Sequence, residues 1–300
     1  MARRISDHAI HRVAHAHFQK TSLPQVILRQ AFWELWIFLA RGIQFRQNRN
    51  CRAREEYAKM SLNEFENINL RQNWANWRTI PKNLATCLES DQPVKAIDLC
   101  CGSGNSTEVL AYYLPAGSEI LGLEYNPQFV EMARIRMYRN RSEGRCSVHF
   151  HTQSVLDPFS DEKGVQIQTA SFDVVNASGA FGHHFAPREA AIVVGEIRRI
   201  LKPDGFAMID TGKKGTDKKS LIEIFSSLGF EQINAAKSCW IDRHEQLCFA
   251  ASDSKTTRKD NNGVKEETET TGPKSSHLNP YSPIYRTKNG QMLRPSDHND

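Results

Sequence analysis

The sequence predicts an α/β fold in which a doubly wound sheet of seven strands, the last of them antiparallel, follows an N-terminal helical extension. Two observations predict the sheet. From Val94 onward, short apolar segments alternate with segments of helical periodicity, which is typical of parallel strands joined by covering helices. The last two apolar segments are joined by a connection too short to hold a helix, so we expect them to pair antiparallel at one edge.

Composition divides the 300 residues into four segments. Before the alternating region the chain is rich in helical patterns, and after it the chain is polar with few large apolar residues. We therefore expect a flexible basic N-terminus at 1–23, a helical lid or extension at 24–90, a ligand-binding domain at 91–252 and a disordered polar tail at 253–300.

The first helical pattern, residues 24–45, is apolar over most of its surface. Its polar residues Gln30, Glu34 and Arg41 fall near one stripe of a 3.6-residue period. We favour a helix that packs on the core of the protein itself. The alternative is an interfacial helix in which residues 26–45 rest on a membrane.

The second helical pattern covers residues 61–84. Ser61 and Glu64 have the spacing of a capping box, which predicts the first turn of a helix there. Pro81 is expected to end or kink this helix because proline lacks the backbone N–H that the next turn requires.

The alternating region supplies the sheet and its covering helices. The helices are expected at 105–114, 127–140, 187–201 and 217–228. The strands are expected at 94–99, 118–125, 146–153, 172–178, 205–212, 231–239 and 245–252.

Charge and cysteine content restrict the function. Residues 1–90 hold 14 Lys and Arg against 7 Asp and Glu, whereas residues 91–252 hold 17 against 20, which argues against nucleic acid as a substrate. The seven cysteines are irregularly spaced and include no C-x-x-C pair, so we expect reduced thiols, no metal site and a cytoplasmic, possibly membrane-associated location.

The turn after the first strand, "AIDLCCGSGNST" at 96–107, predicts a nucleotide-type site. Gly102 and Gly104 allow the backbone to approach a ligand, but Thr107 replaces the third glycine that a dinucleotide site uses. Glu124 at the end of the second strand is placed to accept hydrogen bonds from ribose hydroxyls, and Asp98 suits a cationic ligand. S-adenosyl-L-methionine has a ribose and an ammonium group but no phosphate, and it fits this set.

Four segments together resemble the successive motifs of class I S-adenosylmethionine-dependent methyltransferases, which have a Rossmann-like fold. The doubled cysteine is similar to the quinone-biosynthesis C-methyltransferases of that family. The resemblance implies that the cofactor is bound by Asp98, Cys100, Gly102, Gly104, Glu124, Tyr125, Gln153, Ser154 and Asn176. The segments are "AIDLCCGSGNST", "ILGLEYNPQFVEMAR", "FDVVNASGAF" and "EIRRILKPDGFAMID".

The methyl acceptor is harder to identify. His183 and His184 follow the fourth strand and are candidates to position or deprotonate an acceptor, although a plain loop role is equally compatible. The helical extension is expected to cover the pocket, and a large apolar lid suits a small apolar or aromatic acceptor. The candidate acceptor residues are Tyr57, Trp74, Trp77 and Arg78, although the two tryptophans have the spacing of a helix core face.

Three alternative functions stay open. A protein or nucleic-acid methyltransferase is disfavoured by the net negative charge of the domain. A catalytically inactive S-adenosylmethionine-binding protein is disfavoured by the intact set of Asp98, Gly104 and Glu124. A nicotinamide oxidoreductase is disfavoured by the missing third glycine.

Overall fold

The computed structural model describes residues 22–42, 56–57, 59–88, 91–141, 144–212, 214–242, 244–251, 285–286 and 292–293. Residues 1–257 and 258–300 form two separate units. In the second unit, β8 (Tyr285–Arg286) and β9 (Met292–Leu293) pair antiparallel. Of the flexible N-terminus expected at 1–23, Ser22 and Leu23 are described and begin a helix instead. The rest of that segment, and the tail expected at 253–300 apart from these two strands, lie outside the described residues and stay predictions.

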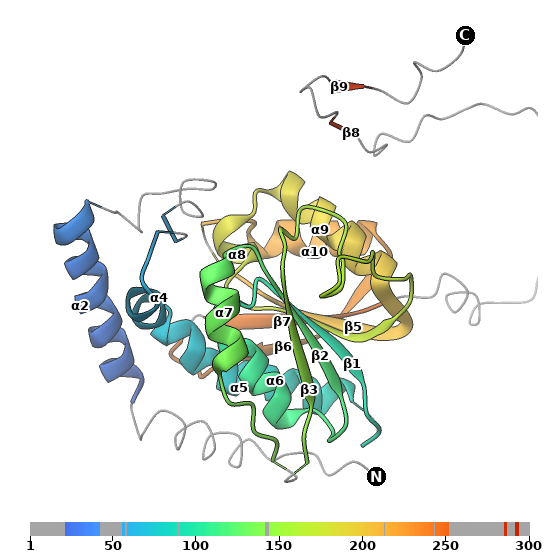
Figure 1. Ribbon diagram of the computed structural model, residues 1–300, viewed down its shortest axis with the longest axis horizontal. Coiled ribbons are helices and arrows are strands. Elements are labelled where there is room, and N and C mark those ends of the chain that lie inside the picture. The colour runs from blue at the N-terminus through green and yellow to red at the C-terminus, as the bar shows by residue number, and fades with distance from the viewer. Residues whose placement is uncertain are drawn as a thin grey trace, which may run out of the picture. The chain divides into compact units, whose positions relative to one another are not determined.

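A seven-stranded sheet forms the centre of the first unit (Figure 1). The strand order is β3-β2-β1-β4-β5-β7-β6, and β7 runs antiparallel to both of its neighbours. The predicted doubly wound sheet with an antiparallel last strand is therefore confirmed. The strands are β1 (Lys95–Leu99), β2 (Glu119–Glu124), β3 (Ser147–Thr152), β4 (Phe172–Ala177), β5 (Leu201–Asp210), β6 (Phe230–Lys237) and β7 (Glu245–Ala251).

Helices cover both faces of the sheet, as its near-continuous apolar strands require. One face packs on α9 (Pro187–Ile200) and α10 (Lys218–Ser227) in the largest hydrophobic core. The other face packs on α6 (Asn105–Tyr113) and on the last helix of the extension, and α7 (Pro127–Ile135) lies against β3 on this side. One short helix, α8 (Phe181–His184), was not predicted, because four residues are too few to show a period.

The extension contains α2 (Leu23–Arg41), α4 (Leu62–Ile68) and α5 (Leu70–Cys87). The predicted capping box is confirmed: Ser61 Oγ accepts from the backbone N–H of Glu64, and the Glu64 carboxylate accepts from the backbone N–H of Ser61 at 2.8 Å. Of the two alternatives expected at Pro81, an end of the helix is wrong, because α5 continues to Cys87, and a kink stays a prediction. Ile80 and Leu84 are buried against the sheet on either side of Pro81, and this packing outweighs one missing hydrogen bond.

The helix α2 packs on α4 and α5 in an unexpected orientation. Its polar residues face the protein: the Gln30 carboxamide accepts from the backbone N–H of Arg71 at 3.0 Å and donates to Glu34 at 2.9 Å. Val26 and Ile37 are the residues of α2 that are buried. Much of the apolar surface of α2 is therefore directed away from the protein. Among the described residues, no helix combines the length and apolarity needed to cross a bilayer.

Candidate active site

The glycine turn after β1 has the backbone that its sequence predicts. Gly102 and Gly104 have positive φ angles of 55° and 85°, which favour glycine. Cys100 also has a positive φ, of 55°, although it carries a side chain. A Cβ atom on Gly104 would come within 3.2 Å of the Cβ of Ala133 on α7, so the glycine also lets the turn pack closely on its neighbour.

Asp98 supports this turn from within the core. Its carboxylate is fully buried and accepts hydrogen bonds from Ser106 Oγ at 2.7 Å, Thr107 Oγ1 at 2.6 Å and the Asn176 carboxamide at 2.7 Å. Burial raises the pKa of Asp98, and the three hydrogen bonds oppose that rise. Asp98 thus fixes the first turn of α6 and the end of β4 in one arrangement.

Glu124 joins the end of β2 to the same turn. One carboxylate oxygen accepts from the backbone N–H of Gly102 at 3.0 Å, and the other accepts from that of Asn126 at 2.9 Å. Burial raises the pKa of Glu124, and these backbone hydrogen bonds oppose the rise. The backbone N–H of Tyr125 also interacts with this carboxylate, so of its four lone pairs one is left to accept from a hydroxyl group of a ligand.

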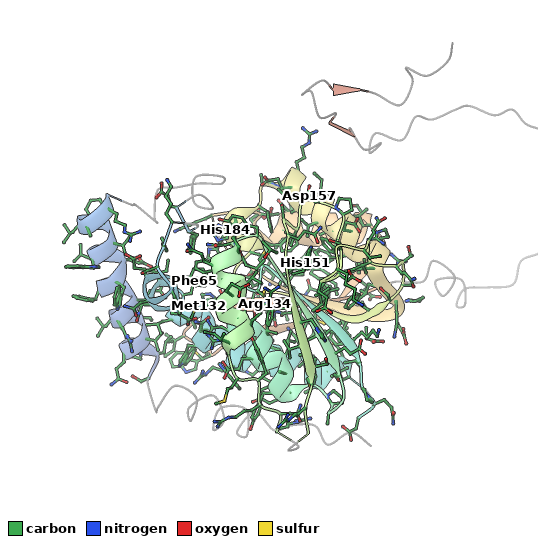
Figure 2. The ribbon with its side chains drawn as sticks, in the orientation of Figure 1. Phe65, Met132, Arg134, His151, Asp157 and His184 are labelled. Atoms are coloured by element: carbon green, nitrogen blue, oxygen red, sulfur yellow. The ribbon has the colours of Figure 1, made fainter. Side chains whose placement is uncertain are left out.

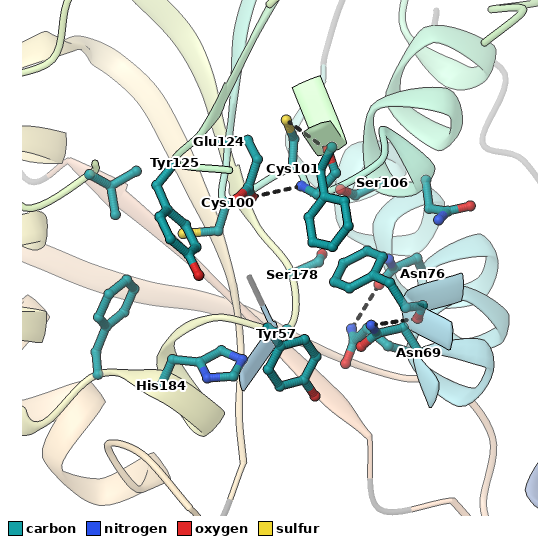
Figure 3. Close-up of a pocket in the computed structure, with 18 of the residues that line it drawn as sticks. Tyr57, Asn69, Asn76, Cys100, Cys101, Ser106, Glu124, Tyr125, Ser178 and His184 are labelled. Atoms are coloured by element: carbon teal, nitrogen blue, oxygen red, sulfur yellow. Dashed lines mark hydrogen bonds between the residues drawn. The ribbon is translucent and has the colours of Figure 1, made fainter. Parts of the chain in front are cut away.

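A cavity of about 360 Å³ opens beside this turn. It lies beyond the carboxyl ends of β1, β2, β3 and β4, where ligands bind in open α/β sheets. Figure 3 shows Glu124 and Cys101 on one side of the cavity, with Tyr57 and His184 on the other. The described residues that line it include no Lys or Arg, which disfavours a phosphate-bearing ligand and suits a cationic one.

The structure brings most of the predicted cofactor residues to this cavity. Three others, Asp98, Gly104 and Asn176, lie behind the wall and support it. The Gln153 side chain lines the wall but also holds its own loop: its oxygen accepts from the Ser160 backbone N–H at 2.9 Å, and its nitrogen donates to the Pro158 carbonyl. The predicted residues on the wall are Cys100, Gly102, Glu124, Tyr125, Gln153 and Ser154.

The extension is attached directly to the glycine turn. The Glu66 carboxylate on α4 accepts from the Asn105 carboxamide at 3.0 Å, from Ser103 Oγ, and from the Arg136 guanidinium at 2.8 Å. Arg136 also donates to the Ser103 carbonyl at 2.9 Å. This cluster fixes α4 over the turn, and Phe65 of α4 lines the cavity together with His184 of α8 (Figure 2).

One face of α5 contributes a row of carboxamide side chains that sequence reasoning missed. The signal was present, since positions 69, 72, 73 and 76 follow the i, i+3, i+4, i+7 spacing of a single helix face. The sequence analysis assigned these amides no role, and the structure shows that the sheet and α2 pack against this helix. The four that line the cavity are Asn69, Gln72, Asn73 and Asn76.

The candidate acceptor residues divide between the cavity and the core. Tyr57 lines the cavity, but Trp74, Trp77 and Arg78 do not. Trp77 packs against the sheet and Trp74 against Val26, so their helix spacing marks a core face. The Arg78 guanidinium lies 3.6 Å from the centroid of the Trp74 ring and donates to the Trp74 carbonyl.

The two candidate histidines also differ. His184 lines the cavity, and its ring meets that of Tyr57 edge-on, with centroids 5.1 Å apart. His183 is not part of the wall, and burial lowers its pKa to about 3, so it is a poor proton acceptor at neutral pH. Within the described residues no group of three His, Cys, Asp or Glu side chains is placed to hold a metal ion.

Comparisons with known proteins agree on one family. A family profile described as a methyltransferase domain matches residues 90–265. The demethylmenaquinone methyltransferase of Lactobacillus johnsonii is 31% identical over 110 residues, which are 37% of this chain and 40% of that protein. An uncharacterized methyltransferase of Synechocystis is 28% identical over 117 residues, which are 39% of this chain and 46% of that protein. The chain thus spans less than half the length of these curated relatives.

Solved structures include similar chains at low sequence identity. The TehB-like S-adenosylmethionine-dependent methyltransferase of Corynebacterium glutamicum is 22% identical, with a TM-score of 0.40. The match covers 54% of this chain and 82% of that one.

Proposed function

We propose a methyl acceptor for this chain, which belongs to the S-adenosylmethionine-dependent methyltransferases. The proposed acceptor is a small aromatic molecule with oxygen substituents, such as a phenol or a hydroquinone. The carboxamide row of α5 carries this proposal. Part of the row is already paired within the protein: Gln72 donates to Asn76 Oδ1 at 2.9 Å and lies 2.8 Å from His244 Nε2, and Asn69 donates to the Phe65 carbonyl. A purely apolar acceptor would leave the remaining hydrogen-bonding capacity of Asn73 and Asn76 unused in the pocket, which costs free energy. An aromatic ring with hydroxyl or carbonyl groups satisfies both the amides and the neighbouring aromatic side chains.

The cofactor end of the site fits S-adenosylmethionine on the observations above. Glu124 is placed to accept from ribose hydroxyls, and Tyr125 follows it at the rim of the pocket. Gly102 leaves room at the turn, and the absence of Lys and Arg among the described lining residues suits a sulfonium rather than a phosphate. When bound, the cofactor supplies an activated methyl group, so the protein needs mainly to align the acceptor and exclude water.

The acceptor end is assigned to the opposite wall. Tyr57 and His184 meet edge-on there, and Phe185 adds a third ring. Asn73 and Asn76 extend from α5 toward the same space and offer both donors and acceptors. We assign His184 the role of orienting an acceptor hydroxyl and accepting its proton, since His183 is buried away from the wall.

The relatives are compatible with this assignment. Several are named demethylmenaquinone methyltransferase, which is a name for an enzyme acting on an oxygenated aromatic ring system. Because the matched region is about two fifths of those proteins, the acceptor of this chain is a proposal that rests on its own pocket.

Methyl transfer from labelled S-adenosylmethionine to a panel of acceptors tests the proposal. We expect transfer to hydroquinones and phenols and little transfer to alkyl amines, peptides or nucleic acid. Asn76→Leu should lower kcat/KM for the acceptor at least tenfold while S-adenosylhomocysteine binds as in the wild type. Thr86→Val, near the end of the same helix and away from the cavity, is the matched control.

Two outcomes would contradict the proposal in different ways. If the protein binds S-adenosylhomocysteine but transfers label only to protein or nucleic acid, the acceptor class is wrong. If it binds S-adenosylhomocysteine and transfers to nothing in the panel, the chain is better described as a binding protein.

A further inference from the structure

The outward face of α2 is an apolar surface that the fold does not use. Leu28 and Leu39 are each 70% exposed and Phe32 is 63% exposed. Positions 28, 32, 35 and 39 recur at i, i+4, i+7 and i+11, so their side chains form one continuous stripe along the helix. We define the outward face as Leu28, Phe32, Leu35, Trp36 and Leu39, all of them exposed.

The orientation of α2 distinguishes its exposed apolar face from the surface of an ordinary core-covering helix. The polar residues of the helix are held against the protein, where Gln30 accepts from Arg71 on α5 and Arg29 donates to Asn67 on α4 at 3.0 Å. A helix whose only role was to cover the core would place its apolar side inward and its polar side in water. Here the inward side has its own buried anchors, Val26 and Ile37, and the outward face is left without a partner among the described residues.

The charges that flank α2 in the sequence suit one kind of partner. The sequence before α2 carries Arg3, Arg4, Arg12 and Lys20 against a single acid, Asp7. The sequence after it, residues 43–55, carries four arginines against a single glutamate. An apolar helix face between two basic segments has the composition of a helix that inserts shallowly into an anionic lipid surface. A tryptophan on that face suits the boundary between headgroups and acyl chains.

We propose that the outward face of α2 is a membrane-docking surface that lies at the headgroup level of a bilayer containing anionic lipids. The inward side of the same helix packs through Ile37 and Trp33 in a cluster with Tyr57 and Phe65, and those two residues line the cavity. Docking therefore places the outer wall of the pocket next to the bilayer surface. This inference goes beyond the proposed function and does not depend on the identity of the acceptor.

Vesicle flotation with the full chain tests the proposal. We expect the protein to float with vesicles of phosphatidylcholine and phosphatidylglycerol, and to float much less with phosphatidylcholine alone. The double variant Leu28→Ser, Leu35→Ser should lower the bound fraction at least tenfold. A matched control is Ile192→Ser on α9, which is also half exposed but lies on the opposite face of the sheet from α5.

Tryptophan fluorescence gives a second readout that locates the contact. Brominated phosphatidylcholine in the vesicles should quench Trp36, because bromine atoms on the acyl chains quench only indoles that reach them. The measurement is made in a Trp240→Phe background, because Trp240 is 92% exposed. Replacing Trp36 by Phe should then remove most of the quenching, since Trp74 and Trp77 are buried and Trp33 packs on the inward side of α2.

Several results would overturn the proposal. One is flotation that the Leu28 and Leu35 replacements do not reduce, and another is no flotation at all. A third is a monomer–dimer equilibrium in analytical ultracentrifugation, without vesicles, that the same replacements abolish, since this would identify the face as an interface between two copies. Binding of S-adenosylhomocysteine to each variant shows separately that the fold and the cofactor site are intact.

Discussion

The ring of Phe65 lies directly over Gly102, so that a Cβ atom built on the glycine would come within 2.8 Å of the ring's Cζ atom. Phe65 belongs to the extension and Gly102 to the turn after β1, so this contact joins the extension to the glycine turn. The ring is held on its other side by Phe129, with centroids 4.1 Å apart. Phe65 is therefore a tightly fitted part of the pocket wall.

Gly102→Ala should weaken S-adenosylhomocysteine binding at least tenfold. Alanine at a φ of 55° costs about 1–2 kcal/mol, and its methyl group would also displace Phe65 from the wall. Isothermal titration calorimetry measures the affinity. Gly164→Ala is the matched control, because Gly164 has a similar φ of 77° but no atom near the added methyl group. An equal loss of S-adenosylhomocysteine affinity in both variants would show that backbone strain alone, and not the contact with Phe65, causes the weaker binding.

Replacing Glu66 should weaken the attachment of α4 to the glycine turn after β1. The side chains of Glu66 and Arg136 are 27% and 24% exposed, so their ion pair is only partly screened by water. A double-mutant cycle of Glu66→Gln and Arg136→Met should give a coupling free energy of about 1 kcal/mol. The free energies of unfolding for the cycle are measured by chemical denaturation. S-adenosylhomocysteine affinity should fall in both single variants. Additive effects of the two substitutions would contradict a direct interaction.

Asp210 should make the protein less stable as the pH rises. Burial raises the pKa of Asp210 to about 6, and its Oδ2 atom has no hydrogen-bond partner among the described residues. Between the unfolded pKa of about 4 and the folded value, only the unfolded chain is ionised, so rising pH favours unfolding. The free energy of unfolding should fall by about 3 kcal/mol in total. The fall is complete above about pH 6 and absent below about pH 4.

Asp210→Asn removes this titration while keeping the shape of the side chain. The free energy of unfolding of the variant should depend less on pH than that of the wild type between pH 4 and pH 7, by the amount given above. Urea denaturation at several pH values measures it. The same slope in both proteins would show that Asp210 is not the group responsible.

Cys100 should be a reporter of cofactor binding. Cys100 lines the cavity and is half-buried, whereas Cys101, which also lines the cavity, and Cys248 are buried. We expect S-adenosylhomocysteine to slow the alkylation of Cys100 by N-ethylmaleimide, as measured by peptide mass spectrometry. Cys239 is partly exposed away from the cavity and serves as an internal control. Equal protection of both thiols would mean that the ligand acts on the whole fold and not at the turn.

The sheet was predictable because each strand carries a local signal. β1, β2 and β4 are short, mostly apolar segments buried along most of their length, and each contains or is followed by a polar residue or a glycine near its carboxyl end. The position of Glu124 at the glycine turn follows from the parallel pairing of β1 with β2 and needs no other information. For this reason sequence motifs alone could bring Gly102 and Glu124 together at one wall of the cavity.

The acceptor end was less predictable because it depends on how helices pack. Trp74 and Asn73 are adjacent in the sequence, yet one enters the core beneath α2 and the other lines the cavity. The rotation of α5 about its axis decides between them, and that rotation is fixed by Ile80 and Leu84 against the sheet. The inward direction of the polar stripe of α2 has the same origin, since the partner of Gln30 is the backbone of a distant residue, Arg71.

The position of β7 has a consequence for how the chain is made. This strand comes last in the sheet-forming sequence but lies between β5 and β6, where it pairs with Phe206–Asp210 on one side and Phe230–Lys237 on the other. A ribosome that has translated only as far as residue 240 has therefore produced β5 and β6 without β7, the strand that pairs with both of them. Until residues 245–251 emerge, an apolar edge of β5 stays open to other nascent chains. Chaperone demand should therefore be concentrated late in synthesis of the domain.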